Sequence, residues 1–176
     1  MPRQKRRSPP LLTLVLGGAR SGKSRHAESL LTAMPPPWVY IATAEAHDAE
    51  MAARIAAHRA ARADGWRTIE APHDLPSALD TAADAPVLVD CLTLWLSNLM
   101  LAGNDIDRAR ESLLAALARR HAPTVLVSNE VGLGIVPDNA LARAFRDEAG
   151  RLHQTIAARA GRVVFMVAGL AMAVKG

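Results

Sequence analysis

Cysteine, aromatic residues and long apolar runs are all scarce in this chain of 176 residues. The single cysteine, Cys91, excludes an internal disulfide and favours a reducing compartment. Aromatic residues make up only 3% of the chain, whereas single-stranded nucleic acids usually bind on exposed aromatic rings. No apolar run is long enough to cross a bilayer, and no secretory signal is present. We therefore expect a cytoplasmic protein that neither inserts into a membrane nor binds nucleic acid.

The formal net charge is +4, and much of it lies in residues 3–7, just before two prolines. We expect residues 1–10 to form a disordered basic tail. Hydrophobic residues account for 50% of the chain, which is enough to build a sizeable core. No linker divides residues 11–176, so we expect them to form a single domain.

Strand-like and helix-like runs alternate along the chain. The runs that resemble strands are 11–16, 38–42, 66–69, 87–90, 124–128 and 162–167. The runs that resemble helices are 25–31, 47–61, 75–82, 92–101, 106–120 and 139–160. Near-continuous apolar strands between helices predict an α/β fold with a parallel sheet covered on both faces.

Ligands of such sheets bind at the carboxyl ends of the strands. This rule predicts that five polar segments meet along one edge of the sheet. These segments are Gly17–Ser24, Thr43–Glu45, Glu70, Asp90 and Asn129–Glu130.

The residues Gly17-Gly18-Ala19-Arg20-Ser21-Gly22-Lys23-Ser24 follow the first apolar strand and precede a helix. They fit the phosphate-loop pattern G-x-x-x-x-G-K-[ST], in which backbone N–H groups and the helix N-terminus hold the phosphates of a nucleotide. In this pattern Lys23 reaches the β- and γ-phosphates and the Ser24 hydroxyl binds Mg²⁺. The alternative is a glycine-rich turn with an exposed lysine.

Asp90 ends an apolar strand, and in phosphate-loop proteins an acid at this place holds Mg²⁺. Together with the phosphate loop this favours a metal-binding role. The alternative is that Asp90 caps the N-terminus of the helix 92–101, and the two roles are compatible.

His58 shares one face of the helix 47–61 with Met51, Arg54 and Ile55. On these grounds alone a partly buried or surface histidine is the favoured interpretation. The remaining histidines are scattered, so no zinc site is expected. They are His26, His47, His73, His121 and His153.

Residues 129–137 combine a polar pair, Asn129 and Glu130, with two glycines and a proline. Loops at this edge of an α/β sheet often carry function. The alternative is a turn into the next helix, capped by Asp138 or Asn139. Arginines further along this helix offer contacts to an anionic substrate, although a solvated helix face explains most of them.

Several ordered segments together resemble the bifunctional adenosylcobinamide kinase / adenosylcobinamide-phosphate guanylyltransferases of cobalamin biosynthesis. The resemblance starts in the phosphate loop and extends over nearly all of the chain from Leu11 onward. The segments that carry it are Gly17–Glu28, Tyr40–Ala44, Asp48–Ile55, His58–Arg59, Trp66–Glu70, Val89–Thr93, Ser128–Pro137, Phe145–Asp147, Gly150–Arg151 and Val167–Gly169.

This resemblance implies a RecA-like phosphate-loop NTPase fold with three layers, a mostly parallel central sheet and assembly into a homotrimer. It implies phosphorylation of adenosylcobinamide with ATP or GTP, followed by transfer of GMP from GTP through a GMP–histidine at His58, with Mg²⁺ as the divalent cation. Lys23 would act on the phosphates, and Ser24 and Asp90 would bind the metal. The nucleotide-binding residues implied are Gly17, Gly18, Ala19, Arg20, Ser21, Gly22, Lys23, Ser24, Ala42, Thr43, Ala44, Arg59, Glu70 and Asp90.

Two other functions remain open at this point. A kinase with a single activity would use the same phosphate loop, with His58 in a structural role. A nucleotide-binding regulatory module would bind nucleotide without cobinamide turnover. A covalent GMP adduct distinguishes the bifunctional enzyme from both.

Overall fold

The computed structural model describes residues 11–46, 49, 53, 56 and 64–176. The predicted tail 1–10 lies outside this part of the chain, as does most of the predicted helix 47–61. His58 and Arg59 also lie outside the described residues, so the structure does not place them.

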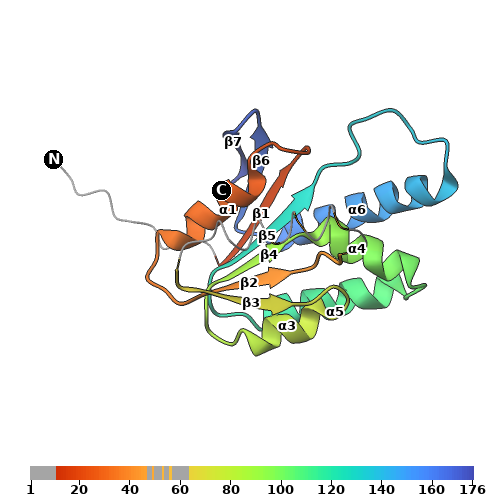
Figure 1. Ribbon diagram of the computed structural model, residues 1–176. Coiled ribbons are helices and arrows are strands. Elements are labelled where there is room, and N and C mark those ends of the chain that lie inside the picture. Colours follow the sequence, from red (N-terminus) through yellow and green to blue (C-terminus); the bar gives the residue numbers. More distant parts are fainter. Residues whose placement is uncertain (1–10, 47–48, 50–52, 54–55, 57–63) are drawn as a thin grey trace.

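In the described part, seven strands form one sheet with the order β3-β2-β4-β5-β1-β6-β7. All of them except β7 run parallel (Figure 1). The strands are β1 (Leu12–Gly17), β2 (Trp38–Ala42), β3 (Trp66–Glu70), β4 (Val87–Asp90), β5 (Thr124–Asn129), β6 (Arg162–Val167) and β7 (Leu170–Lys175). This arrangement confirms the predicted α/β fold with a mostly parallel sheet.

Helices connect the strands and begin close to where the sequence predicts. They are α1 (Lys23–Thr32), α3 (Leu75–Thr81), α4 (Leu92–Leu101), α5 (Ile106–Ala118) and α6 (Ala140–Arg159). Of the two caps considered for α6, Asp138 and Asn139, the structure selects Asn139, whose side chain accepts hydrogen bonds from two backbone N–H groups of the first turn. The predicted capping role of Asp90 is wrong: Cys91 occupies the N-cap position of α4, and no side chain caps this helix.

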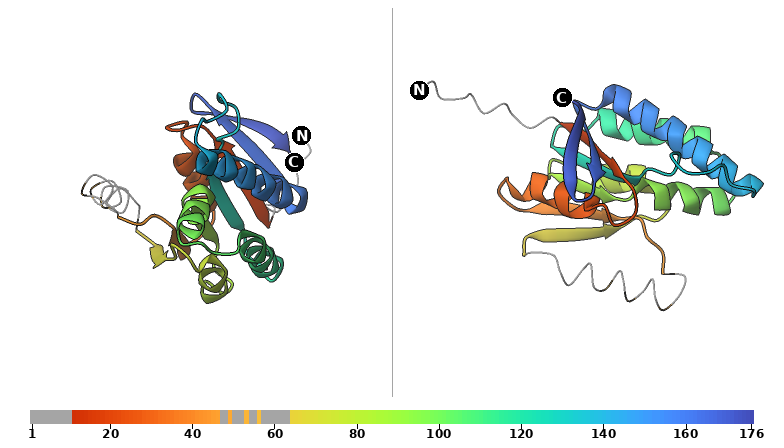
Figure 2. Two further views of the ribbon diagram at one scale, coloured as in Figure 1. Left: turned by 90° about the vertical axis from the view of Figure 1, so that its right-hand side faces the viewer. Right: turned by 90° about the horizontal axis from the view of Figure 1, so that it is seen from above.

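Alternate residues of the strands point into two separate apolar clusters, one on each face of the sheet. On one face Val15, Leu88 and Val127 pack against Ala27 and Leu31 of α1. On the other face strand residues pack against α3, α4, α5 and α6. Figure 2 shows these layers from two further directions. The near-continuous apolar character of the strands follows from this burial on both faces.

No strand is predicted from the sequence after residue 167, but the structure has β7 there. Ala168 and Gly169 form a tight turn with φ of 50° and 81°, and β7 returns antiparallel to β6. Such two-residue turns suit a hairpin because their twist matches that of the strands. The alternating α/β pattern gave no reason to expect an antiparallel edge strand.

Among the residues that the structure describes, none of the helices has the length and apolar character needed to cross a membrane.

Candidate active site

The parallel strands bring the predicted polar segments to one edge of the sheet, which we call the carboxyl edge. In the registers of neighbouring strands Gly17 lies beside Asn129, and Ala42 lies beside both Glu70 and Asp90. β5 lies between β1 and β4. The phosphate loop and Asp90 are therefore one strand apart, with Asn129 and the residues after it between them.

The phosphate loop, Gly17–Ser24, connects the end of β1 with the start of α1. A Cβ atom on Gly17 would lie 2.7 Å from both the Met166 carbonyl oxygen and the Ser21 Oγ, so a larger residue does not fit. Gly22 precedes the helix with a φ of 90°, in the left-handed region that favours glycine. These two positions explain why the loop needs the glycines of its motif.

Contacts from the β6–β7 turn and from the residue that follows β5 hold this loop from outside. The Gly169 N–H donates to the Ser21 carbonyl at 3.1 Å, and the Glu130 N–H donates to the Gly17 carbonyl at 3.0 Å. Inside the loop, the buried Ser21 Oγ has no hydrogen-bond partner. An unsatisfied buried hydroxyl costs free energy, so its survival in the loop suits a site that gains a polar ligand.

Lys23 is the first residue of α1 and is buried, with 8% of its surface exposed. Its Nζ donates to the Gly18 carbonyl at 2.6 Å, so the ammonium group folds back over the loop. Burial lowers the pKa of Lys23, and the nearby Asp90 and Cys91 oppose this shift only in part. The predicted alternative of a turn with an exposed lysine is therefore wrong.

Asp90 is half-buried at the end of β4, and its Oδ2 accepts a hydrogen bond from the Tyr40 hydroxyl at 3.0 Å. Beside it, the buried Thr43 hydroxyl donates to the Cys91 carbonyl at 2.7 Å and accepts from the Cys91 N–H at 2.8 Å. The Thr43 side chain thus joins the end of β2 to the end of β4.

α4 contributes further polar side chains to this edge. The Asn98 Nδ2 donates to the carbonyls of Thr43, at 2.9 Å, and Pro72, at 3.0 Å. The Asn129 Nδ2 donates to the Thr93 Oγ1 at 2.8 Å. No role of Asn98 is predicted from the sequence, although an asparagine in a mostly apolar helix is a signal for such a partner.

A second set of polar contacts lies under the loop that follows β5. The Ser128 Oγ lies 2.7 Å from the His153 Nε2, and both side chains are buried. The His153 Nδ1 lies 3.9 Å from the Glu130 Oε2. In the sequence, His153 is one of several scattered histidines with no predicted role. Its place among the buried residues of α6, with Ala149, Leu152 and Ile156, is the signal that would have indicated one.

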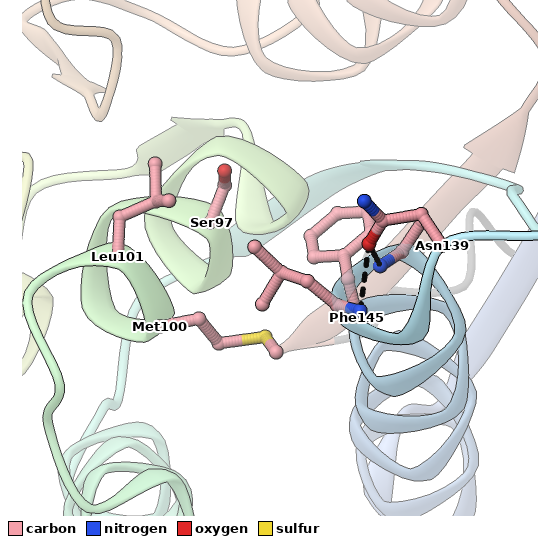
Figure 3. A pocket seen from close by; sticks show the side chains of 7 residues that line it. Ser97, Met100, Leu101, Asn139 and Phe145 are labelled. Atoms are coloured by element: carbon pink, nitrogen blue, oxygen red, sulfur yellow. Dashed lines mark hydrogen bonds between the residues drawn. The ribbon is translucent and has the colours of Figure 1, made fainter.

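A groove of about 400 Å³ lies between α4 and α6, beyond this edge. Figure 3 shows the lining residues, with Met100 of α4 extending toward Asn139 and Phe145 at the start of α6, and with Ser97 and Leu101 on the same helix as Met100. The exposed side chains of Leu133, Ile135 and Val136 belong to the preceding loop. The described residues include no group of three or more His, Cys, Asp or Glu side chains placed to hold a metal ion.

Comparison with known proteins supports what this geometry indicates. Residues 13–174 match the family described as cobinamide kinase / cobinamide phosphate guanyltransferase. The chain belongs to this family. Membership confirms the predicted resemblance and the two predicted activities, cobinamide kinase and cobinamide phosphate guanylyltransferase in cobalamin biosynthesis. The single-activity kinase and the regulatory module do not account for a family with both activities.

Two curated relatives cover nearly the same length as this chain. The bifunctional adenosylcobalamin biosynthesis protein CobP of Pseudomonas aeruginosa is 53% identical over 167 residues, which are 93% of this chain and 96% of the relative. The bifunctional adenosylcobalamin biosynthesis protein CobU of Salmonella typhimurium is 44% identical over 182 aligned positions, covering 94% of this chain and 100% of the relative.

Among solved structures, the fold resembles a prototypical ATPase from the type III secretion system of pathogenic bacteria. The TM-score is 0.56 at 11% identity, and the match covers 93% of this chain but only 56% of that ATPase. This likeness supports a phosphate-loop NTPase fold for this member of the cobinamide kinase / cobinamide phosphate guanyltransferase family.

Proposed function

We propose that this enzyme phosphorylates the hydroxyl on the aminopropanol arm of adenosylcobinamide with ATP or GTP, and then transfers GMP from GTP to the new phosphate. The second step yields adenosyl-GDP-cobinamide and pyrophosphate. The observation that carries the proposal is a phosphate loop at the same carboxyl edge as Asp90, one strand away, in a chain of this family.

The phosphate loop serves both reactions, since each uses a nucleoside triphosphate. Backbone N–H groups of residues 18–24 and the N-terminus of α1 hold the phosphates. The buried Lys23 ammonium exchanges its contact with the Gly18 carbonyl for phosphate oxygens and offsets charge that builds up during transfer.

Ser24 and Asp90 would hold Mg²⁺. A hydroxyl and a carboxylate are hard oxygen donors, and Mg²⁺ usually takes one or two protein ligands together with phosphate oxygens. The absence of a larger ligand cluster among the described residues agrees with this type of site. When bound, Mg²⁺ neutralises charge on the triphosphate. The Tyr40 hydroxyl, which donates to Asp90 at 3.0 Å, keeps the carboxylate in a fixed orientation.

His58 is the proposed nucleophile of the guanylyl step. A neutral imidazole nitrogen attacks the α-phosphorus of GTP, the bond to the β-phosphate breaks, and pyrophosphate leaves with the bonding electrons. An oxygen of adenosylcobinamide phosphate then attacks the same phosphorus and releases the histidine. Ala42, Thr43 and Ala44 at the end of β2, together with Arg59 and Glu70, are proposed to bind the guanine nucleotide.

Assembly into a homotrimer is also proposed. The edge strand β7 exposes the side chains of Leu170, Met172 and Val174, which a neighbouring subunit would cover. Sedimentation should then give three times the chain mass of 18.8 kDa, whereas a monomer would contradict this assembly.

The test of the proposed function is incubation with Mg²⁺ and GTP labelled at the α-phosphate, followed by denaturation. Covalent label that is labile in acid and stable in alkali identifies a phosphoramidate and supports the histidine intermediate. A protein that binds GTP but takes up no label would contradict the guanylyl step.

Two variants assign the residues in this experiment. Lys23→Ala should lower both activities by about 100-fold or more, because the charge on the phosphates is no longer offset. His58→Ala should lose the label and keep kinase activity. Label on the His58→Ala variant would show that another residue is the nucleophile.

A further inference from the structure

Three side chains form a line from the interior to the phosphate loop. Ser128 lies on β5 and is fully buried, His153 lies on α6 and is 7% exposed, and Glu130 follows β5 with 22% of its side chain exposed. The Ser128 Oγ is 2.7 Å from His153 Nε2, and His153 Nδ1 is 3.9 Å from Glu130 Oε2. Neither of the two reactions, as described above, uses any of these side chains.

Glu130 lies directly against the phosphate loop through its own backbone. Its N–H donates to the Gly17 carbonyl at 3.0 Å, and its Oε1 accepts from the Gly132 N–H at 2.6 Å. One carboxylate oxygen is thus held in place while the partly exposed side chain stays accessible from the carboxyl edge. Asp90 and Glu70 lie further from β1, because β5 separates β1 from β4, and β3 is an edge strand.

His153 can orient the second oxygen of Glu130. Burial lowers the pKa of His153, although Glu130 raises it in part, so the ring is neutral near pH 7. A neutral imidazole donates from one nitrogen and accepts at the other. In the tautomer whose Nε2 accepts from the Ser128 hydroxyl, the Nδ1–H group faces Glu130. The 3.9 Å between Nδ1 and Oε2 is longer than a hydrogen bond. A small movement of either side chain when substrate binds would bring the two atoms within hydrogen-bond distance.

This line is not a hydrolytic triad. The Ser128 hydroxyl is 0% exposed, so no substrate reaches it. Of the three side chains, the Glu130 carboxylate is the most exposed, so it is the group that can contact a substrate.

The two reactions of this enzyme differ in their need for a base. The kinase step uses a neutral hydroxyl, whose proton must leave as the oxygen attacks phosphorus. The guanylyl step uses a neutral imidazole and then a phosphate oxygen that is already anionic. Only the kinase step therefore requires a group that accepts a proton from the substrate.

We propose that Glu130 is the general base of the kinase step and that His153 is a positioning residue which acts through it. The inference rests on the proposed function. As the arm hydroxyl attacks the γ-phosphorus, its O–H bond breaks and the proton moves to Glu130 Oε2. The bond between the γ-phosphorus and the bridging oxygen breaks, and the nucleoside diphosphate leaves with that electron pair. Glu130 then returns its proton to solvent.

Glu130→Gln tests this role, since glutamine keeps the shape and an acceptor for Gly132 but cannot take the proton. Glu111→Gln is the matched control, because Glu111 is exposed on α5. Kinase turnover of adenosylcobinamide and GMP labelling from α-labelled GTP are measured on the same preparations. We expect Glu130→Gln to lose about 100-fold or more in kinase kcat, with labelling unchanged.

His153→Gln should show a smaller loss in kinase kcat with an unchanged KM for the nucleotide and unchanged labelling. A Glu130→Gln kinase within about threefold of the control would overturn the inference, and so would an equal loss of both activities. If the unmodified enzyme neither takes up label nor phosphorylates adenosylcobinamide, the proposed function fails, and the inference fails with it.

Discussion

The two sides of the carboxyl edge are held together in different ways. Around β1, backbone groups fix the phosphate loop, as the contacts of Gly17 and Ser21 with Glu130 and Gly169 show. Around β2 and β4, side chains such as those of Thr43 and Asn98 make the connections. A site for phosphate needs a loop whose main-chain N–H groups point toward one place, and glycine allows the backbone to adopt that conformation. The proposed sites for Mg²⁺ and for the guanine nucleotide need side chains in fixed orientations, which hydrogen-bonded partners supply.

The largest effect should come from a change on the backbone-held side. In Gly17→Ala the added Cβ would lie 2.7 Å from the Met166 carbonyl oxygen, so the loop must move. Displacing reacting groups by about 1 Å can cost about 100-fold, and we expect at least this loss in both activities. Overpacking should also lower the free energy of unfolding by about 1–3 kcal/mol.

Gly18→Ala is the control for the unfolding measurement, because nothing lies within 4 Å of a Cβ at Gly18. Thermal unfolding of this variant should match the unmodified protein. Equal destabilisation by the two substitutions would contradict the steric explanation for Gly17.

A smaller effect should follow a change on the side-chain-held side. Asn98→Ala removes the donor shared by the Thr43 and Pro72 carbonyls and leaves both without this partner. We expect the free energy of unfolding to fall by about 1–3 kcal/mol in denaturant titrations. Asn104→Ala, at an exposed position after α4, should change it by less than about 0.5 kcal/mol. Similar values for both variants would show that the Asn98 contacts contribute little.

The smallest effect concerns pH. Burial lowers the pKa of His153 below its value of 6.5 in the unfolded chain, so the unfolded state binds more protons as pH falls. The resulting stability is fully present above about pH 6.5 and is lost on acidification. Between about pH 8 and pH 5, His153→Gln should lose less stability than the unmodified protein.

The unmodified protein is the reference for this titration, and its decrease in the free energy of unfolding between the two pH values is measured alongside the variant. A His153→Gln variant with that same decrease would show that His153 does not contribute to the pH dependence.

The sequence predicts most of the fold because its signals are local. Apolar runs of strand length and the helix caps are read within a few neighbouring residues, so β5 and the Asn139 cap appear where expected. β7 is missed because its hairpin depends on a turn at Ala168–Gly169 whose left-handed geometry is not typical of alanine.

The site is predicted only where its groups are close in sequence. The phosphate loop is contiguous, and its glycines report the required backbone shape directly. The bonds of Thr43 to Cys91 and of Ser128 to His153 join residues far apart in the chain, and composition and spacing contain no record of such pairs. For Asp90, the alternative role as a helix cap is a purely local interpretation, and the structure contradicts it because Cys91 occupies the N-cap position.

The position of β1 in the sheet also sets an order of assembly during synthesis. β1 is translated first, yet both of its partners, β5 and β6, come from the later part of the chain, as does Gly169. Contacts between distant segments form slowly because a long loop must close before they gain any free energy. The ribosome therefore releases the glycine motif long before the strands that shape it, and the nascent enzyme acquires its nucleotide pocket only when synthesis is nearly complete.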